Sequence, residues 1–274
     1  MTLSERNNFF KAGIVSCAVC AILVITATFF TMPLYSENLI EPPADGNKSL
    51  ISSIAGLNYF AVHISLLFFA VFSLAGMILI YYYFERTSTP EILYIAFFVV
   101  SCSFEVIRII IPLQLVIQFP LIYIITGMRI LLFARFFGIF SLFTAGICST
   151  GFEIQRMRNA ILIITIAAMI LTMGIPIDAL NWNASFNAVN GYNSMFRMIE
   201  LVVFITIIAS FLITAKNKDS KEYVHAAFGI MIALIGRNFL QNTDNWIGAI
   251  LGIIMLSFGM LTLCTKLHKI HLWL

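Results

Sequence analysis

The chain has 274 residues, of which 61% are hydrophobic and only 11% are charged, and its mean hydropathy is +0.98. Soluble domains are about one quarter charged, so a water-soluble fold of this size is excluded. The net charge of +3 is small, and no basic run with interleaved aromatic residues lies outside the apolar segments, so no nucleic-acid partner is expected. The composition predicts an all-α integral membrane protein, a polytopic helix bundle that forms a single domain.

Eight apolar segments can be placed along the chain, because a transmembrane helix needs roughly 20 apolar residues. In chain order they are expected at about 12–34, within 53–84, at 90–112, within 119–150, and at 159–176, 194–215, 222–240 and 246–265. The first segment exceeds the core of a signal peptide, so we expect a retained anchor helix. The second and fourth are too long for one straight crossing, and we expect them to tilt or to project past the headgroups.

The remaining segments are short and polar. We expect the longest of them, DALNWNASFNAVNGYN, to be a loop, and KLHKIHLWL (266–274) to be a basic amphipathic tail on anionic lipid. His268 and His271 in that tail could also bind metal, but this interpretation is weaker. All cysteines lie in apolar segments or at their ends, so we expect packing roles and no metal or cofactor. They are Cys17, Cys20, Cys102, Cys148 and Cys264.

Basic residues are distributed unevenly between the two sides of the predicted bundle. One side holds Arg6, Lys11, Arg86, Arg156, Arg158, Lys216, Lys218, Lys221, Lys266 and Lys269. The other side holds only Lys48. The positive-inside rule therefore predicts cytoplasmic termini and outward-facing segments at 35–52, 113–118, 177–193 and 241–245. A multi-pass protein of a plasma membrane, the inner membrane of a bacterium, is expected.

Charged residues also interrupt the apolar segments, where each costs ~2.5–3.5 kcal/mol at the centre of a bilayer. They are Glu105, Arg108, Arg129, Arg135, Arg197, Glu200 and Arg237. Two of the segments carry an Arg and a Glu three residues apart, in SFEVIRIIIP and in FRMIE, so each pair lies on one helical face. The glutamate precedes the arginine in the first motif and follows it in the second, and the two helices are expected to cross the membrane in opposite directions. We therefore predict the same arrangement in both, an outer arginine with a glutamate one turn deeper.

Three interpretations of these charges are open. The arginines could extend to the outer headgroups, or the Glu–Arg pairs could hold helices together. Five arginines against two glutamates leave three positive charges, however, and this excess favours an outward-open polar cavity that binds an anion. Its predicted lining is Arg108, Arg129, Arg197, Arg237, Glu105, Glu200, His63, Asn238 and Gln241. Arg135 is expected nearer the middle of the membrane, with no assigned role.

The passage GMILIYYYFERTSTPEILYIAFFVVS (Gly76–Ser101) joins two predicted helices through a tyrosine-rich helix end and a short charged turn. It resembles the helix junction of bacterial seven-transmembrane-helix sensory modules. The resemblance implies that the second to eighth segments form the seven-helix unit, with the first as an anchor. Members of that family usually continue into a cytoplasmic kinase, phosphatase or cyclase domain, so we expect this chain to need a cytoplasmic or membrane signalling partner.

Three functions follow as hypotheses. The favoured one is a receptor-like module that binds an anionic small molecule or lipid headgroup from outside. A transporter of an organic anion would use broken helices, usually within repeats; Pro112 and Pro120 agree with it, but no repeat is evident. An enzyme acting on lipid phosphates ranks last, because the apolar segments hold no Asp away from their ends and no catalytic residue can be assigned.

Overall fold

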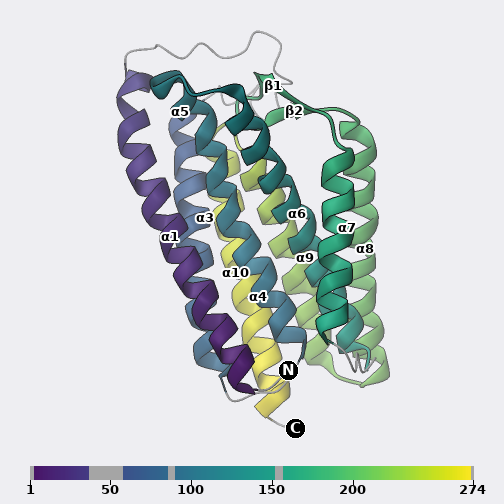
Figure 1. The fold of residues 1–274 in the computed structure, drawn as a ribbon. Coiled ribbons are helices and arrows are strands. Elements are labelled where there is room, and N and C mark those ends of the chain that lie inside the picture. The colour runs from purple at the N-terminus through teal and green to yellow at the C-terminus, as the bar shows by residue number, and fades with distance from the viewer. Residues whose placement is uncertain (1–2, 37–57, 86–89, 152–156, 273–274) are drawn as a thin grey trace.

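A computed structural model describes residues 3–36, 58–85, 90–151 and 157–272, which form a bundle of long helices (Figure 1). The helices are α1 (Leu3–Ser36), α3 (Tyr59–Phe84), α4 (Pro90–Ser103), α5 (Ile110–Ile117), α6 (Leu121–Ser149), α7 (Met157–Gly174), α8 (Asn193–Asn217), α9 (Lys221–Gln241) and α10 (Trp246–Leu272). Within the described residues, seven helical segments are long and apolar enough to cross a membrane. The predicted all-α multi-pass bundle is confirmed to this extent. The fifth expected segment, at 159–176, corresponds to α7, whose apolar part Asn159–Gly174 is shorter than the other seven.

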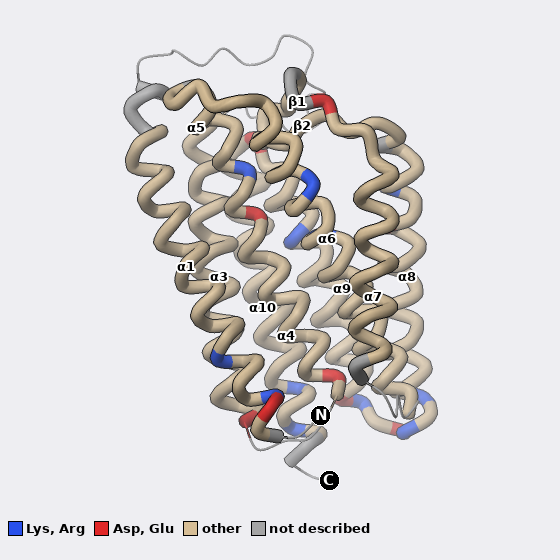
Figure 2. Tube along the Cα trace, viewed as in Figure 1, with Lys and Arg blue, Asp and Glu red and all other residues tan. Residues whose placement is uncertain are grey.

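The two ends of the bundle differ in structure and in charge. Both termini lie at one end, the termini end, while α5 and a β-hairpin lie at the other, the hairpin end (Figure 1). Lysines and arginines gather at the termini end, and a second group of charges lies inside the bundle, toward the hairpin end (Figure 2). The buried charges that the sequence indicated therefore belong to one half of the bundle.

The segment expected as one helix over 90–112 is divided into three parts. A 3-10 helix, η1 (Phe104–Ile109), separates α4 from α5, and α5 continues to Ile117. Pro112 cannot donate a hydrogen bond to the carbonyl of Arg108, and its ring crowds that carbonyl, which favours a tighter winding just before it. The outward turn expected at 113–118 is therefore largely helical, and only Gln118 has left-handed backbone, with φ 52°.

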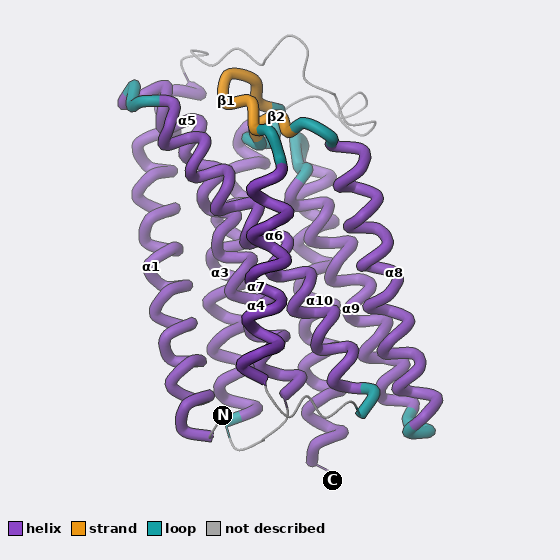
Figure 3. Tube along the Cα trace, turned by 45° about the vertical axis from the view of Figure 1, so that its right-hand side comes forward, coloured by secondary structure: helices purple, strands orange, loops and turns teal. Residues whose placement is uncertain are grey.

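The longest polar connection is not the plain loop that the sequence predicted. It contains β1 (Ile177–Trp182) and β2 (Ala188–Asn190), which pair antiparallel at the hairpin end (Figure 3). Between the strands, Phe186 is fully buried and stacks on Tyr59 at 5.9 Å between ring centroids. The hairpin thus closes over the bundle and brings polar loop residues to the buried charges.

Helix α1 begins at Leu3, well before the expected start at residue 12, and it is more than an anchor. It packs along α3. The Arg6 guanidinium donates hydrogen bonds to the carbonyls of Phe84 and Glu85, at 2.9 and 3.1 Å. Those carbonyls lie at the C-terminal end of α3, where helical backbone lacks internal partners, so Arg6 satisfies them.

Helix α10 continues to Leu272, so residues 266–272 of the expected tail extend the last helix. Lys266 and Lys269 both pair with Glu222 of α9, at 2.9 and 2.7 Å. The His268 ring packs against Tyr83 at 4.8 Å between centroids. The side chains of His271 and Arg158 lie outside the described part, as do Lys48, Arg86, Arg156 and residues 37–52 of the expected outer segment.

Helices α9 and α10 approach each other most closely, through glycines. A Cβ added to Gly236 would lie 2.5 Å from the backbone nitrogen of Leu256, and one added to Gly259 would lie 2.5 Å from that of Ala233. Small residues allow such contact between helices in lipid, where packing rather than the hydrophobic effect holds helices together. This close pair fixes the position of α9, which carries Arg237 and Gln241.

Candidate functional site

The Glu105 carboxylate lies at the centre of the buried charges and is fully buried. Arg135 of α6 donates to both of its oxygens, from Nε to Oε1 at 2.8 Å and from Nη2 to Oε2 at 2.7 Å. Arg108 Nε lies 3.2 Å from Oε2, and the Gln241 side-chain amide donates to Oε1 at 2.6 Å. Three helical elements therefore meet at one carboxylate, with the paired geometry that makes Arg–carboxylate contacts strong.

Arg108 is also fully buried, and its remaining donors go to backbone carbonyls. Its Nη1 donates to the carbonyl of Gln241 at 2.9 Å and to that of Ser185 at 3.2 Å. Its guanidinium carbon lies 5.8 Å from the ring centroid of Phe69. Arg108 therefore joins η1 to the end of α9 and to the hairpin, and it has little capacity left for a ligand.

Asn187 of the hairpin loop completes this network. Its side-chain oxygen accepts a hydrogen bond from Arg135 Nη2 at 2.8 Å. Its side-chain nitrogen donates to the carbonyl of Gln241 at 2.9 Å. We name Glu105, Arg108, Arg135, Asn187 and Gln241 the charge cluster. It has one carboxylate for two guanidinium groups, so it carries a net charge of +1 by formal count.

Arg237 lies beside the charge cluster without joining its carboxylate. Its side chain is 3% exposed, its guanidinium carbon lies 5.6 Å from the Phe98 ring centroid, and its Nη2 donates to the Arg135 carbonyl at 3.3 Å. Within the described part of the chain, its Nε has no hydrogen-bond partner. Arg237 is thus a buried cation with unused donor capacity.

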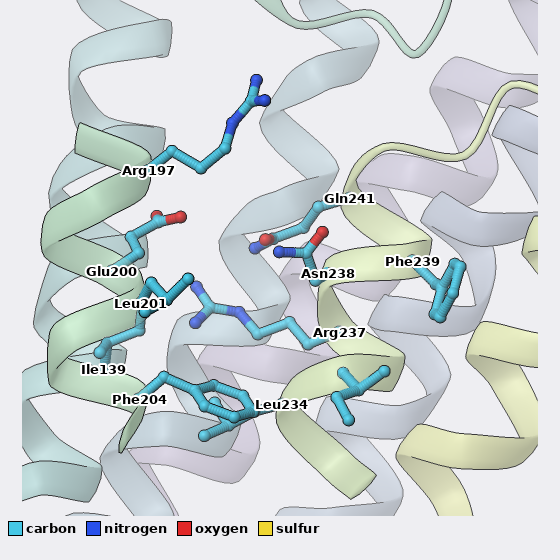
Figure 4. A pocket seen from close by; sticks show the side chains of 11 residues that line it. Ile139, Arg197, Glu200, Leu201, Phe204, Leu234, Arg237, Asn238, Phe239 and Gln241 are labelled. Carbon is cyan, nitrogen blue, oxygen red and sulfur yellow. The ribbon is translucent and has the colours of Figure 1, made fainter. Parts of the chain in front are cut away.

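A pocket of about 410 Å³ lies between α8 and α9, beside Ile139 of α6. Its polar residues are Arg197, Glu200, Arg237, Asn238 and Gln241, and its apolar residues are Ile139, Leu201, Phe204, Leu234, Ile235 and Phe239. Arg237 reaches from α9 toward α8 just below Glu200, and the side-chain amides of Asn238 and Gln241 lie close together above Arg237 (Figure 4). We name this cavity the α8–α9 pocket.

The pocket unites five of the nine predicted site residues and leaves out four. Glu105 and Arg108 are in the charge cluster. His63 is buried against Phe186, at 5.6 Å between ring centroids. Arg129 points to α7, where its Nη1 lies 3.6 Å from the sulfur of Met173. The predicted single cavity is therefore resolved into a saturated charge cluster and a neighbouring pocket, joined by Gln241.

Arg197 and Glu200 do not reproduce the arrangement of Glu105 and Arg108. Arg197 is exposed and Glu200 is half-buried. Among the described residues, no cation forms an ion pair with Glu200. The expectation of equal geometry in the two motifs is corrected: one pair is buried and saturated, and the other lines an open pocket.

The sequence interpretation missed three features. The first is Arg135, which had no assigned role but holds Glu105. The second is Asn187, which lies in a segment expected to be a loop. The available signal was the surplus of amides in NWNASFN, since amides can satisfy buried charges that lack a counter-ion. The third is Glu91, near the termini end. It is 4% exposed, and its Oε2 has no hydrogen-bond partner in the described part of the chain.

The described residues hold no group of three or more His, Cys, Asp or Glu side chains placed to bind a metal ion. The chain matches no protein-family model, and no curated protein matches it. The proposed function therefore rests on the geometry of the charge cluster and of the α8–α9 pocket.

Proposed function

We propose that this chain is a receptor-like multi-pass membrane protein that binds an anionic ligand in the α8–α9 pocket. One observation carries the proposal: Arg237 lines the pocket, is 3% exposed, and keeps an Nε without a partner in the described residues. An unpaired guanidinium in a protein interior is costly. A carboxylate or phosphate in the pocket would offset this cost, because both match the fork geometry of arginine.

The charges around the pocket favour an anion as well. The charge cluster has a formal excess of one positive charge, and Arg237 and Arg197 add two against the single charge of Glu200. The surplus of two lies in apolar helices, where ions are expensive and mark functional sites. A bound anion would reduce this surplus.

A receptor needs a path from the ligand to the rest of the bundle, and two residues supply one. Gln241 lines the pocket and donates to Glu105, and Arg237 lines the pocket and donates to the carbonyl of Arg135. Glu105 belongs to η1, and 3-10 segments within helices often mark hinges. We propose that a ligand held by these two side chains alters the winding of η1 and the position of α4, which a signalling partner would read.

The orientation is part of the proposal. The basic residues at the termini end favour a cytoplasmic position for that end by the positive-inside rule. The pocket residues Arg197, Arg237 and Gln241 lie within about two turns of the opposite ends of their helices. The ligand would therefore bind from the outer half of a plasma membrane, which in a bacterium is the inner membrane.

Binding of dodecyl phosphate to purified protein in maltoside detergent tests the proposal through thermal unfolding. A ligand that binds only the native state at 100 times its Kd stabilises it by about 2.7 kcal/mol, so the Tm should rise with ligand concentration. Arg237→Gln should weaken binding about tenfold or more, because it removes a charged donor. The matched control is Arg129→Gln, which removes an arginine outside the pocket and should bind like wild type. Equal affinity in Arg237→Gln and wild type would refute the anion site.

Transport of an organic anion is the second candidate, and the division of the third predicted span favours it. Transporters place their sites at helices interrupted near the membrane centre, as η1 interrupts the span from Pro90 to Gln114. Uptake of radiolabelled decyl phosphate by proteoliposomes separates the two functions. A receptor binds the anion without uptake, whereas a transporter gives saturable uptake that Arg237→Gln reduces.

A further inference from the structure

We infer that the ligand of the α8–α9 pocket is a zwitterionic amphiphile, with an ammonium group beside its phosphate or carboxylate and an apolar chain. This inference rests on the proposed function, since it takes the anionic group to bind at Arg237. It adds two elements that an anion site does not require, a cation that meets Glu200 and a chain that lies along the apolar side of the pocket.

Glu200 gives the first argument. Its side chain points from α8 into the pocket, toward α9, and it is half-buried (Figure 4). No lysine, arginine or histidine of the described residues forms an ion pair with it, although Arg197 lies one turn away on the same helix. A carboxylate without a counter-ion repels an anionic ligand and is unfavourable in an apolar helix. An ammonium group on the ligand removes both penalties.

The positions of the charges give the second argument. Arg197 and Arg237 come from opposite sides of the pocket, and Glu200 lies between them along the bundle axis, with the amides of Asn238 and Gln241 facing it (Figure 4). An anionic group that contacts Arg237 would have an ammonium group a few bonds away within reach of Glu200. The amides can donate to ester or phosphate oxygens. Such alternation of positive and negative groups fits a compact zwitterion better than a simple anion.

The apolar lining gives the third argument. Phe204 and Leu234 extend the pocket beyond Arg237, in the direction of the termini end, and Leu201 lies beside the Arg237 guanidinium (Figure 4). Leu201 is 52% exposed on α8, and its neighbours Val202 and Ile205 are exposed too, as expected for a helix that faces lipid. The pocket therefore borders the bilayer, so an alkyl chain can enter between the helices from the side. A small hydrophilic zwitterion would leave these apolar side chains without contact.

Native mass spectrometry of the full chain tests the inference with three probes. Lysophosphatidylethanolamine carries the phosphate, the ammonium and the chain. Its N-acetyl derivative keeps the phosphate and the chain but loses the positive charge, and glycerophosphoethanolamine keeps the zwitterion without the chain. Wild-type protein should bind the first at least tenfold more tightly than either of the others, since a charged hydrogen bond or a buried chain is lost in each.

Glu200→Gln locates the effect in the pocket. The variant should bind lysophosphatidylethanolamine about tenfold more weakly and should not weaken binding of the N-acetyl derivative. If the wild type binds both lipids equally, or if Glu200→Gln affects both equally, the zwitterion inference is overturned while the anion site stands. If Arg237→Gln leaves binding of both lipids unchanged, the proposed function itself fails. The comparison of probes on wild-type protein decides the inference even where a variant does not fold.

Discussion

Two motifs look equivalent in the sequence, EVIR of η1 and RMIE of α8, but their glutamates differ in burial and in ion pairing. Glu105 is fully buried and accepts hydrogen bonds from Arg135 and Gln241, with Arg108 beside it. Glu200 is half-buried and has no ion pair in the described part of the chain. The same residue types at the same spacing thus form a structural centre in one place and a pocket lining in the other.

The difference comes from what surrounds each motif. Segment η1 lies inside the bundle, where α6, the end of α9 and the hairpin loop all supply donors or acceptors. Helix α8 lies at the edge of the bundle and packs only on α6 and α9 among its principal neighbours. The hydrogen-bond and ion-pair partners of a buried charged side chain decide whether its role is structural. A side chain whose donors or acceptors are all used within the protein has none left for a ligand.

Removal of the Glu105 charge should have the largest effect on stability. Glu105→Gln leaves the fully buried Arg108 and the 14% exposed side chain of Arg135 without this counter-ion, a loss that costs about 3–5 kcal/mol in buried pairs. Thermal unfolding in detergent, followed by circular dichroism, should show a much lower Tm or no folded protein. The matched change Glu200→Gln should alter stability by less than about 1 kcal/mol, since it breaks no ion pair. Equal losses in the two variants would remove the distinction between the motifs.

Replacement of arginine by lysine should give a smaller contrast. Arg135→Lys keeps the charge but loses the two-pronged contact with Glu105 and the bond to Asn187, which should cost about 1–3 kcal/mol. Arg197→Lys on exposed α8 should leave the Tm unchanged. The same unfolding measurement checks both, and a stable Arg135→Lys variant would show that charge alone, without fork geometry, holds the cluster.

The ion pairs at the termini end provide the smallest expected effect. Glu222 pairs with Lys266 and Lys269, whose side chains are 31% and 56% exposed. Surface pairs contribute about 0–1 kcal/mol and are screened by salt. Glu222→Gln should therefore lower stability slightly at low ionic strength and not at all at 1 M salt, whereas the loss in Glu105→Gln should persist at both. A loss from Glu222→Gln that persists at high salt would mean that exposure does not separate these pairs.

Much of the helical architecture could be predicted from the chain. The long apolar runs locate α3, α6, α8, α9 and the start of α10 within a few residues, because a bilayer demands continuous helices long enough to cross it. The break at η1 and the strands β1 and β2 could not be found this way. The strands depend on contacts between distant segments, such as Arg108 with Ser185, which leave no periodic signal. Pro112 is the local signal for the break, but a count of apolar residues does not read it.

The candidate site was predicted in its residue types and only partly in its grouping. Arg197, Glu200, Arg237, Asn238 and Gln241 were expected together and line one pocket. Helix depth groups Arg108 with the other outer arginines. It does not show that Arg108 is saturated, because the hydrogen bonds of Arg108 to backbone carbonyls of the hairpin and α9 cannot be inferred from depth. Helix depth places Arg135 nearer the middle of the membrane and assigns it no role, although the Glu105 side chain reaches it at 2.7 Å.

The sequence by itself determined that the chain forms a helical bundle suited to lipid, because only helices satisfy so much backbone in apolar surroundings. It also determined that charges are buried there, and that positive charges exceed negative ones. Only the tertiary structure decided which of these charges are neutralised and which remain available. Pairing depends on distances between side chains of different helices, and the packing of α4, α6, α8 and α9 with the hairpin sets those distances.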